Sequence, residues 1–302
     1  MRLAPQRHTV TDLRLLLIGS GGFGVPAFDA LHEKHEGSIA AVITAAPRPS
    51  GRDGSLVATQ ETIASLDVTV GLLADFGQIV PAEMLRSVPR GILNLHPSLL
   101  PAYRGAAPIP AAILAGDQET GVSTILMDEG LDTGPLLAVQ RHQLRGDEDA
   151  PRLEAQLAHL AADGIVGTLD RYLAGEIVPS TQPAEGVSLT RRLQRSDGEI
   201  LATWTAEHAH RAWRAYRPWP GVWISLAPAL ERLKLDLIGA PLAGIDVPLG
   251  GLLVHEEVLL LGLKGGALPL LEVTPMGGRR MSGTALIHGR PELLAPHARI
   301  RS

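Results

Sequence analysis

Short apolar runs alternate with segments of helical periodicity in the first quarter of the chain. Apolar runs at residues 13–18, 39–45 and 68–74 predict buried strands. A helical spacing of apolar residues predicts helices at residues 25–34 and 57–66. Strands and helices that alternate at this spacing predict an α/β fold with a doubly wound, mostly parallel sheet.

The same alternation continues through the middle of the chain. Buried strands are predicted at residues 92–96 and 121–127, with a short helix between them at residues 108–115. A long helix is predicted to begin after Asp149, a residue type that caps helix N-termini, and to carry apolar residues at helical spacing as far as Leu169. The first 180 residues therefore form one predicted domain.

Regular periodicity is lost at residues 178–188, which are rich in Pro, Ser and Gly. This composition is typical of a linker, and we place the linker at residues 181–200. An amphipathic helix is predicted beyond it, at residues 206–216. Short strands are predicted at residues 222–226, 252–263 and 268–273. Several short strands joined by Gly-containing turns predict a smaller β-barrel-like, OB-like domain over residues 201–302.

The composition is that of an ordinary globular protein, with 45% hydrophobic and 20% charged residues among 302. The absence of cysteine excludes disulfides, thiolate nucleophiles and sulfur-ligated metals, and it favours a reducing compartment, so we expect a cytoplasmic protein. No apolar run approaches the length of a membrane span.

The net charge of −5 conceals an asymmetry between the two predicted domains. Up to Pro179 there are 13 basic and 21 acidic residues, which give −8, whereas the 14 basic and 11 acidic residues after it give +3. A mildly basic second domain is consistent with a polyanionic partner, although ordinary scatter of surface charge explains it equally well.

Candidate chemistry gathers at the end of the strand predicted at residues 92–96. Asn94 and His96 stand two residues apart, so their side chains lie on the same face of that strand. Pro97 has no backbone N–H to donate, which places His96 where the strand stops and where ligands bind in parallel α/β sheets. Asp132 lies in a separate Gly-bounded turn, and folding must bring it to His96 if these groups act together.

These three residue types suit acyl transfer. An imidazole beside a carboxylate is a general acid or base near neutral pH, and an amide can donate a hydrogen bond to a developing oxyanion. We therefore interpret Asn94, His96 and Asp132 as catalytic residues that help an external nucleophile attack a bound acyl group. No metal is expected, because no H-E-x-x-H or paired-His spacing accompanies His96.

The central motifs resemble those of the folate-dependent formyltransferases. They are Asn-Leu-His-Pro-Ser-Leu-Leu-Pro at residues 94–101, Tyr-Arg-Gly-Ala-Ala-Pro-Ile at residues 103–109 and Gly-Leu-Asp-Thr-Gly at residues 130–134. Arg-Pro-Trp-Pro-Gly at residues 217–221 and the stretch at residues 274–282 are similar to the C-terminal domain of that family. The resemblance therefore spans most of the chain.

The resemblance implies transfer of a formyl group from 10-formyltetrahydrofolate, and it favours the amino group of methionyl-tRNA as the acceptor, a step of translation initiation. It implies catalytic roles for Asn94, His96 and Asp132. It assigns contact with 10-formyltetrahydrofolate to Ser98, Leu99, Leu100 and Pro101. Contact with the substrate or with tRNA is expected at Arg104, Arg48, Arg52, Arg279 and Arg280. A monomer without membrane attachment is expected.

Three features depart from the family pattern. The turn after the first strand reads Gly-Ser-Gly-Gly-Phe at residues 19–23, where the family has Gly-Thr-Pro-Glu/Asp-Phe. The loop after the second strand carries Arg48 and Arg52 instead of several lysines, which weakens the expected contact with tRNA. Residues 54–71 leave room for one helix, where the family has a further strand and helix. In a doubly wound sheet the missing strand would lie at an edge, away from Asn94.

Other functions remain open from the sequence. Residues 19–24 fit the Gly-rich dinucleotide fingerprint, so an NAD(P)-dependent dehydrogenase is an alternative of a different class. The acidic residue expected at the end of the second strand is absent, although Arg48 could accept a 2′-phosphate. A folate-dependent enzyme with a sugar amine or water as acceptor is a closer alternative. A module that only binds nucleic acid would leave Asn94, His96 and Asp132 without a role.

Overall fold

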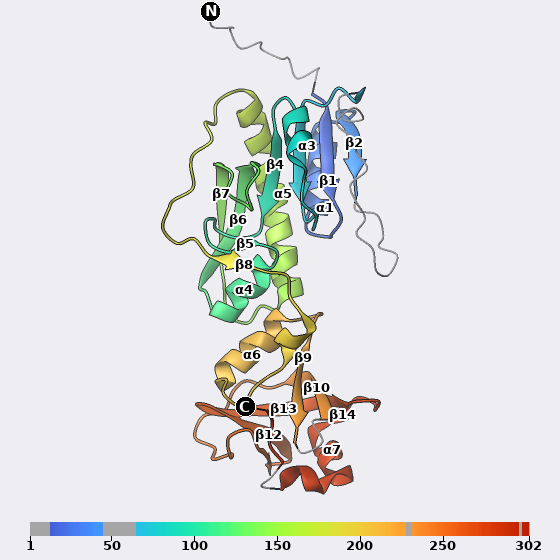
Figure 1. The fold of residues 1–302 in the computed structure, drawn as a ribbon, viewed down its shortest axis with the longest axis vertical. Helices are drawn as coiled ribbons and strands as arrows, with labels where there is room; N and C mark the ends of the chain where they lie inside the picture. Colours follow the sequence, from blue (N-terminus) through green and yellow to red (C-terminus); the bar gives the residue numbers. More distant parts are fainter. Residues whose placement is uncertain (1–12, 45–64, 228–230, 296–297, 302) are drawn as a thin grey trace, which may run out of the picture. The chain divides into compact units, whose positions relative to one another are not determined.

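The computed structural model describes residues 13–44, 65–227, 231–295 and 298–301 (Figure 1). The chain forms two compact units. Unit 1 comprises Met1–Ala112, Gln118–Arg145 and Arg152–Arg191. Unit 2 comprises Ile113–Asp117, Gly146–Pro151 and Arg192–Ser302.

Unit 1 is built around a six-stranded sheet with the strand order β2-β1-β3-β4-β6-β7. Its strands are β1 (Leu15–Gly19), β2 (Ile39–Ile43), β3 (Val70–Ala74), β4 (Ile92–His96), β6 (Glu119–Leu126) and β7 (Leu136–Gln143). The first four run parallel, whereas β6 is antiparallel to β4 and β7 is antiparallel to β6. The predicted mostly parallel α/β fold is confirmed, and the two antiparallel strands lie together at one side.

Burial explains why apolar runs predicted the central strands. All five residues of β1, β3 and β4 are buried, as expected for strands that are covered on both faces. The edge strand β2 is only partly buried, and Val42 is 58% exposed. Most of the helix predicted at residues 57–66 lies outside the described residues.

Within the described residues, the helices that lie wholly or mostly in unit 1 include α1 (Val25–Lys34), α3 (Ala82–Ser87), α4 (Pro108–Ala115) and α5 (Ala150–Leu173). As predicted, α5 begins directly after Asp149. It runs beside the sheet, where Gln140 of β7 donates a hydrogen bond to the Leu160 carbonyl at 2.7 Å (Figure 1). The sequence did not predict α3 or β7. Among the described helices, none has both the length and the apolar character needed to cross a bilayer.

Unit 2 contains an antiparallel sheet with the strand order β11-β12-β13-β10-β9, and β14 pairs with β13. Its strands are β9 (Val222–Leu226), β10 (Glu231–Ile238), β11 (Leu252–His255), β12 (Val258–Leu263), β13 (Gly266–Pro275) and β14 (Met281–Ser282). The helices are η2 (Arg195–Gly198), α6 (Ala206–Ala215), α7 (Gly283–Gly289) and η3 (Pro291–Leu294). The single strand predicted at residues 252–263 is two strands, because Glu256 and Glu257 both have positive φ and form a hairpin turn.

The last residues of the chain bridge the two edges of this sheet. The Arg301 N–H donates to the Ser225 carbonyl of β9 at 3.3 Å, and the Ile300 N–H donates to the Gly250 carbonyl, just before β11, at 2.8 Å. The edge strands β9 and β11 are thus connected through the tail. This connection gives the predicted β-barrel-like character of the second domain.

Candidate active site

Strand β4 presents Asn94 and His96 at the end of the central sheet of unit 1. It lies between β3, which is parallel to it, and β6, which is antiparallel. Both polar residues are almost fully buried, with 6% and 4% of their surface exposed. Buried polar side chains require partners, because burying one without a hydrogen bond costs several kcal/mol, roughly 2–7 depending on the reference state.

Asp132, in the turn between β6 and β7, is the partner of both side chains. Its Oδ1 accepts a hydrogen bond from Asn94 Nδ2 at 3.2 Å, and its Oδ2 lies 3.6 Å from His96 Nδ1. Oδ2 also accepts a hydrogen bond from the Gly105 N–H at 2.8 Å. The structure therefore brings together the amide, imidazole and carboxylate that the sequence singled out.

Both nitrogens of the His96 ring face hydrogen-bond acceptors. Nδ1 faces the Asp132 carboxylate, and Nε2 lies 2.9 Å from the Tyr103 carbonyl. Burial lowers the pKa of His96 below 6.5, while the negative charge of Asp132 and the hydrogen bond to Tyr103 offset part of that effect. Two acceptors around one ring favour the protonated form and burial favours the neutral form, so the site can hold or release a proton.

Hydrogen bonds to strand β6 hold the loop that is predicted to contact the folate. Ser98, Leu100 and Pro101 are buried, and Leu99 is partly exposed. Ser123 of β6 accepts a hydrogen bond from the Leu100 N–H at 3.0 Å and donates one to the Ser98 carbonyl at 2.7 Å. The loop that follows His96 is therefore fixed to the neighbouring strand.

Residues that the sequence placed in a linker complete the site. Gln182 is buried, and its amide contacts both Arg104 and the Asp132 turn. Ser188 accepts a hydrogen bond from the Tyr103 N–H at 2.8 Å. The short strands β5 (Arg104–Gly105) and β8 (Leu189–Thr190) pair in parallel. No local signal distinguishes a buried Gln in a Pro- and Gly-rich stretch from a solvated one, so sequence reasoning missed this support.

The remaining predicted contact residues are spread along the chain. Arg48 and Arg52 lie outside the described residues. Arg279 and Arg280 lie in unit 2, directly after the turn at Gly277 that joins β13 to β14. Arg279 is exposed, and Arg280 forms an ion pair with Glu272.

The Gly-rich turn after β1 is covered by a carboxylate. A Cβ atom added to Gly21 would lie 1.4 Å from Asp75 Oδ2, so this carboxylate occupies the space above the glycine. Glu154 stands nearby, and its pKa is raised by burial and by the negative charge of Asp75. A pyrophosphate on this turn would meet two acidic side chains, which argues against the dehydrogenase alternative.

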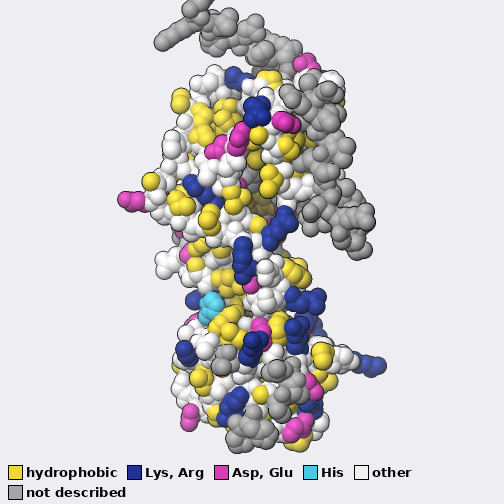
Figure 2. All heavy atoms as spheres, viewed as in Figure 1, with side chains coloured by type: hydrophobic (Ala, Val, Ile, Leu, Met, Phe, Trp, Pro, Cys, Tyr) yellow, Lys and Arg dark blue, Asp and Glu magenta, His cyan; other side chains and the backbone are white. Residues whose placement is uncertain are grey.

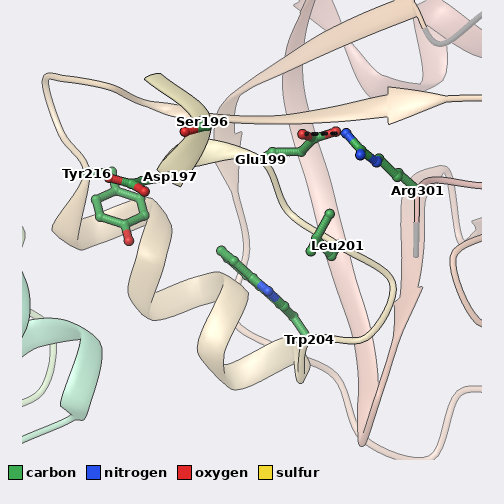
Figure 3. Close-up of a pocket in the computed structure, with 7 residues that line it drawn as sticks. All are labelled: Ser196, Asp197, Glu199, Leu201, Trp204, Tyr216 and Arg301. Atoms are coloured by element: carbon green, nitrogen blue, oxygen red, sulfur yellow. Dashed lines mark ion pairs between the residues drawn. The ribbon is translucent and has the colours of Figure 1, made fainter. Parts of the chain in front are cut away.

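A pocket of about 400 Å³ lies in unit 2 (Figure 3). Asp197, Glu199, Trp204, Tyr216 and Arg301 are among the residues that line it. The figure shows the ion pair between Glu199 and Arg301, in which Oε2 of Glu199 lies 3.6 Å from Nη1 of Arg301. The pocket contains none of the residues that the sequence predicted as functional. Within the described ranges, no group of three or more His, Asp or Glu side chains could hold a metal ion.

The chain matches two family models and several known proteins. Residues 54–169 match the family model described as formyl transferase, and residues 192–291 match the model described as formyl transferase, C-terminal domain. The methionyl-tRNA formyltransferases of Acidiphilium cryptum and Chloroflexus aurantiacus are 37% and 35% identical to this chain. Each comparison covers 92% of this chain and 97% of the relative.

Solved structures share the fold at lower identity. The N-formyltransferase from Helicobacter canadensis, in complex with folinic acid and dTDP-3-aminofucose, has a TM-score of 0.66 at 17% identity and covers 85% of this chain and 98% of that one. The methionyl-tRNA formyltransferase from Clostridium thermocellum has a TM-score of 0.57 at 19% identity and covers 75% and 93%. With curated relatives 35–37% identical over 92% of its length, the chain belongs to the methionyl-tRNA formyltransferase family.

Proposed function

We propose that this chain transfers the formyl group of 10-formyltetrahydrofolate to the amino group of methionyl-tRNA. The observation that carries the proposal is the convergence of Asn94, His96 and Asp132 at the end of β4, in a chain of this family. The reaction needs a donor for developing oxyanion charge and a group that moves a proton. These three side chains supply both.

Asn94 is the proposed oxyanion donor. One hydrogen of its Nδ2 group is directed at Asp132 Oδ1, which fixes the orientation of the amide and leaves the second hydrogen for the carbonyl oxygen of the formyl group. A donor held in place before the reaction needs no reorganisation when charge develops. Such a donor typically contributes about 3 kcal/mol to transition-state stabilisation.

His96 and Asp132 form the proposed proton-handling pair. Asp132 Oδ2 stabilises the imidazolium that results when His96 takes up a proton from the attacking amine as the new C–N bond forms. When the bond between the formyl carbon and N10 of the folate breaks, that proton passes to N10 and tetrahydrofolate leaves. The Gly105 N–H bond keeps that carboxylate oxygen in place. Burial lowers the pKa of His96, which favours the neutral ring that can accept the proton.

The folate is the proposed formyl donor, in line with the folinic acid bound by the Helicobacter canadensis relative. Leu99 is the partly exposed member of the loop at residues 98–101, and Ser123 holds the backbone of that loop. A loop fixed in this way presents a preformed surface beside His96. We propose that Ser98, Leu100 and Pro101 shape this surface from below.

Unit 2 is the proposed tRNA-binding part of the chain. Figure 2 shows several Lys and Arg side chains on its surface, in keeping with the +3 charge of the sequence after Pro179. Arg279 and Arg280, exposed beside a glycine turn, are proposed phosphate contacts. Phosphate contacts make binding depend on salt, so affinity for tRNA should fall steeply as salt increases.

The test compares formyl transfer to methionyl-tRNA by the wild type and by His96→Ala. Loss of general acid or base help is expected to slow turnover about 10²- to 10⁴-fold. His35→Ala is the matched control, because His35 is a partly buried histidine of the same unit whose Nε2 lies 3.0 Å from Asp170 Oδ1. Equal activity of His96→Ala and the wild type would refute the assignment. Release of tetrahydrofolate without an amine acceptor, or with a sugar amine in place of methionyl-tRNA, would replace it with the corresponding alternative.

A further inference from the structure

Gln182 uses its whole amide group to join two parts of the candidate active site. It lies after α5 and is 7% exposed. Its Nε2 donates hydrogen bonds to the carbonyls of Asp132 and Gly134, at 2.8 and 2.7 Å. Its Oε1 accepts hydrogen bonds from the Arg104 guanidinium, from Nε at 3.1 Å and from Nη2 at 2.7 Å. Both donors and the acceptor of the amide are therefore satisfied.

The first pair of bonds acts on the backbone that carries Asp132. Asp132 has a φ of +51°, in the left-handed region that residues with a side chain rarely adopt. The two carbonyls held by Gln182 are on either side of Thr133, so a single NH₂ group clamps the turn at the strained residue. This clamp sets the direction in which the Asp132 carboxylate leaves the backbone.

The hydrogen bonds between Gln182 and Arg104 act on the second segment that contacts the Asp132 carboxylate. Arg104 precedes Gly105, whose N–H donates to Asp132 Oδ2. Gln182 thus contacts both the turn that carries the carboxylate and the strand that anchors one of its oxygens. The distance between these two segments decides how Oδ2 faces His96.

We propose that Gln182 is a positioning residue for formyl transfer, which fixes the Asp132 carboxylate relative to His96 and Asn94. The inference rests on the function proposed above for those three residues. Gln182 acts on them through the backbone carbonyls of Asp132 and Gly134 and through Arg104.

Gln182→Met tests the proposal, because Met has a similar length and cannot form any of these hydrogen bonds. A displacement of the carboxylate by about 1 Å is expected to lower kcat up to 10²-fold, with KM for methionyl-tRNA little changed. In Gln182→Glu the acceptor for Arg104 remains, but a second oxygen faces the two carbonyls. This variant is expected to lose kcat as well, and wild-type turnover by it would overturn the role of the clamp.

The titration of His96 supplies a readout that does not depend on activity. Two groups favour the protonated form of the His96 ring. They are the charged carboxylate of Asp132 and the backbone carbonyl of Tyr103. A displaced carboxylate stabilises the imidazolium less, so the pKa of His96 should be lower in Gln182→Met. NMR of the free protein measures this shift even if the wild type proves to transfer no formyl group. The measurement therefore separates failure of this inference from failure of the proposed function.

Gln140→Met is the matched control. Gln140 is a partly buried glutamine of unit 1 and, like Gln182, donates a hydrogen bond to a backbone carbonyl, that of Leu160. Its loss should lower stability without changing kcat or the pKa of His96. A folded Gln182→Met variant with the wild-type pKa of His96 would show that Gln182 is merely structural and would overturn the inference.

Discussion

Asp132→Asn removes the charge from the candidate active site while it preserves the size and shape of the side chain. At 3.6 Å from His96 Nδ1, the carboxylate stabilises the imidazolium by about 5 kcal/mol at an effective dielectric constant of about 20, before desolvation is subtracted. An amide also has one oxygen for the two donors that now approach, Asn94 Nδ2 and the Gly105 N–H. Leaving one of them unsatisfied costs about 1–3 kcal/mol.

Together these losses predict that Asp132→Asn lowers kcat for formyl transfer by about 10²- to 10⁴-fold. The pH dependence should change as well. Because the carboxylate raises the pKa of His96, its removal lowers that pKa further, and the limb of the kcat profile governed by His96 moves to lower pH. Single-turnover transfer to methionyl-tRNA, followed over a pH series that spans the ordinary pKa of histidine, measures both effects.

Asp170→Asn is the control, because it removes the carboxylate of the His35 pair in the same unit. It should leave both kcat and the pH profile unchanged. The reasoning would be refuted if Asp132→Asn transferred formyl groups within about threefold of the wild type, far less than general acid–base help contributes. Equal losses in both variants would refute it too, since a general electrostatic effect would then explain the result.

Three further predictions concern stability and geometry. Ser123→Ala, which removes a fully buried hydroxyl with hydrogen bonds at 2.7 and 3.0 Å, should lower the free energy of unfolding by about 1–3 kcal/mol in urea titrations. Burial raises the pKa of Asp75 above 3.8, so its ionised form destabilises the fold as pH rises above that value. Asp75→Asn should therefore raise the urea midpoint at pH 7, and the gain should disappear below the unfolded pKa, where the carboxyl is protonated in both states. In Gly134→Ala the new Cβ would lie 1.9 Å from a backbone carbonyl of β6, so transfer should fall, whereas Gly167→Ala on α5, with open space around it, should keep wild-type activity.

Local patterns in the sequence were sufficient for the central sheet and for one half of the site. Residues buried on both faces must be apolar throughout, so β1, β3 and β4 appear as apolar runs. Alternation along a strand places Asn94 and His96 on one face, and Pro97 ends the strand there. Strand β10 was not predicted, although its apolar residues alternate with charged ones in the pattern of a strand with one buried face.

The tertiary structure decided which distant residues meet. Asp132 lies 38 positions from Asn94, and Gln182 lies 50 positions from Asp132. The carboxylate of Asp75 covers a Gly-rich turn that resembles a dinucleotide site in sequence. Hydrophobic periodicity indicates which face of each element is buried, because burial favours an apolar residue at each buried position separately. Contacts between segments depend on the order of strands and the path of loops, and the spacing of residues along the chain does not encode them.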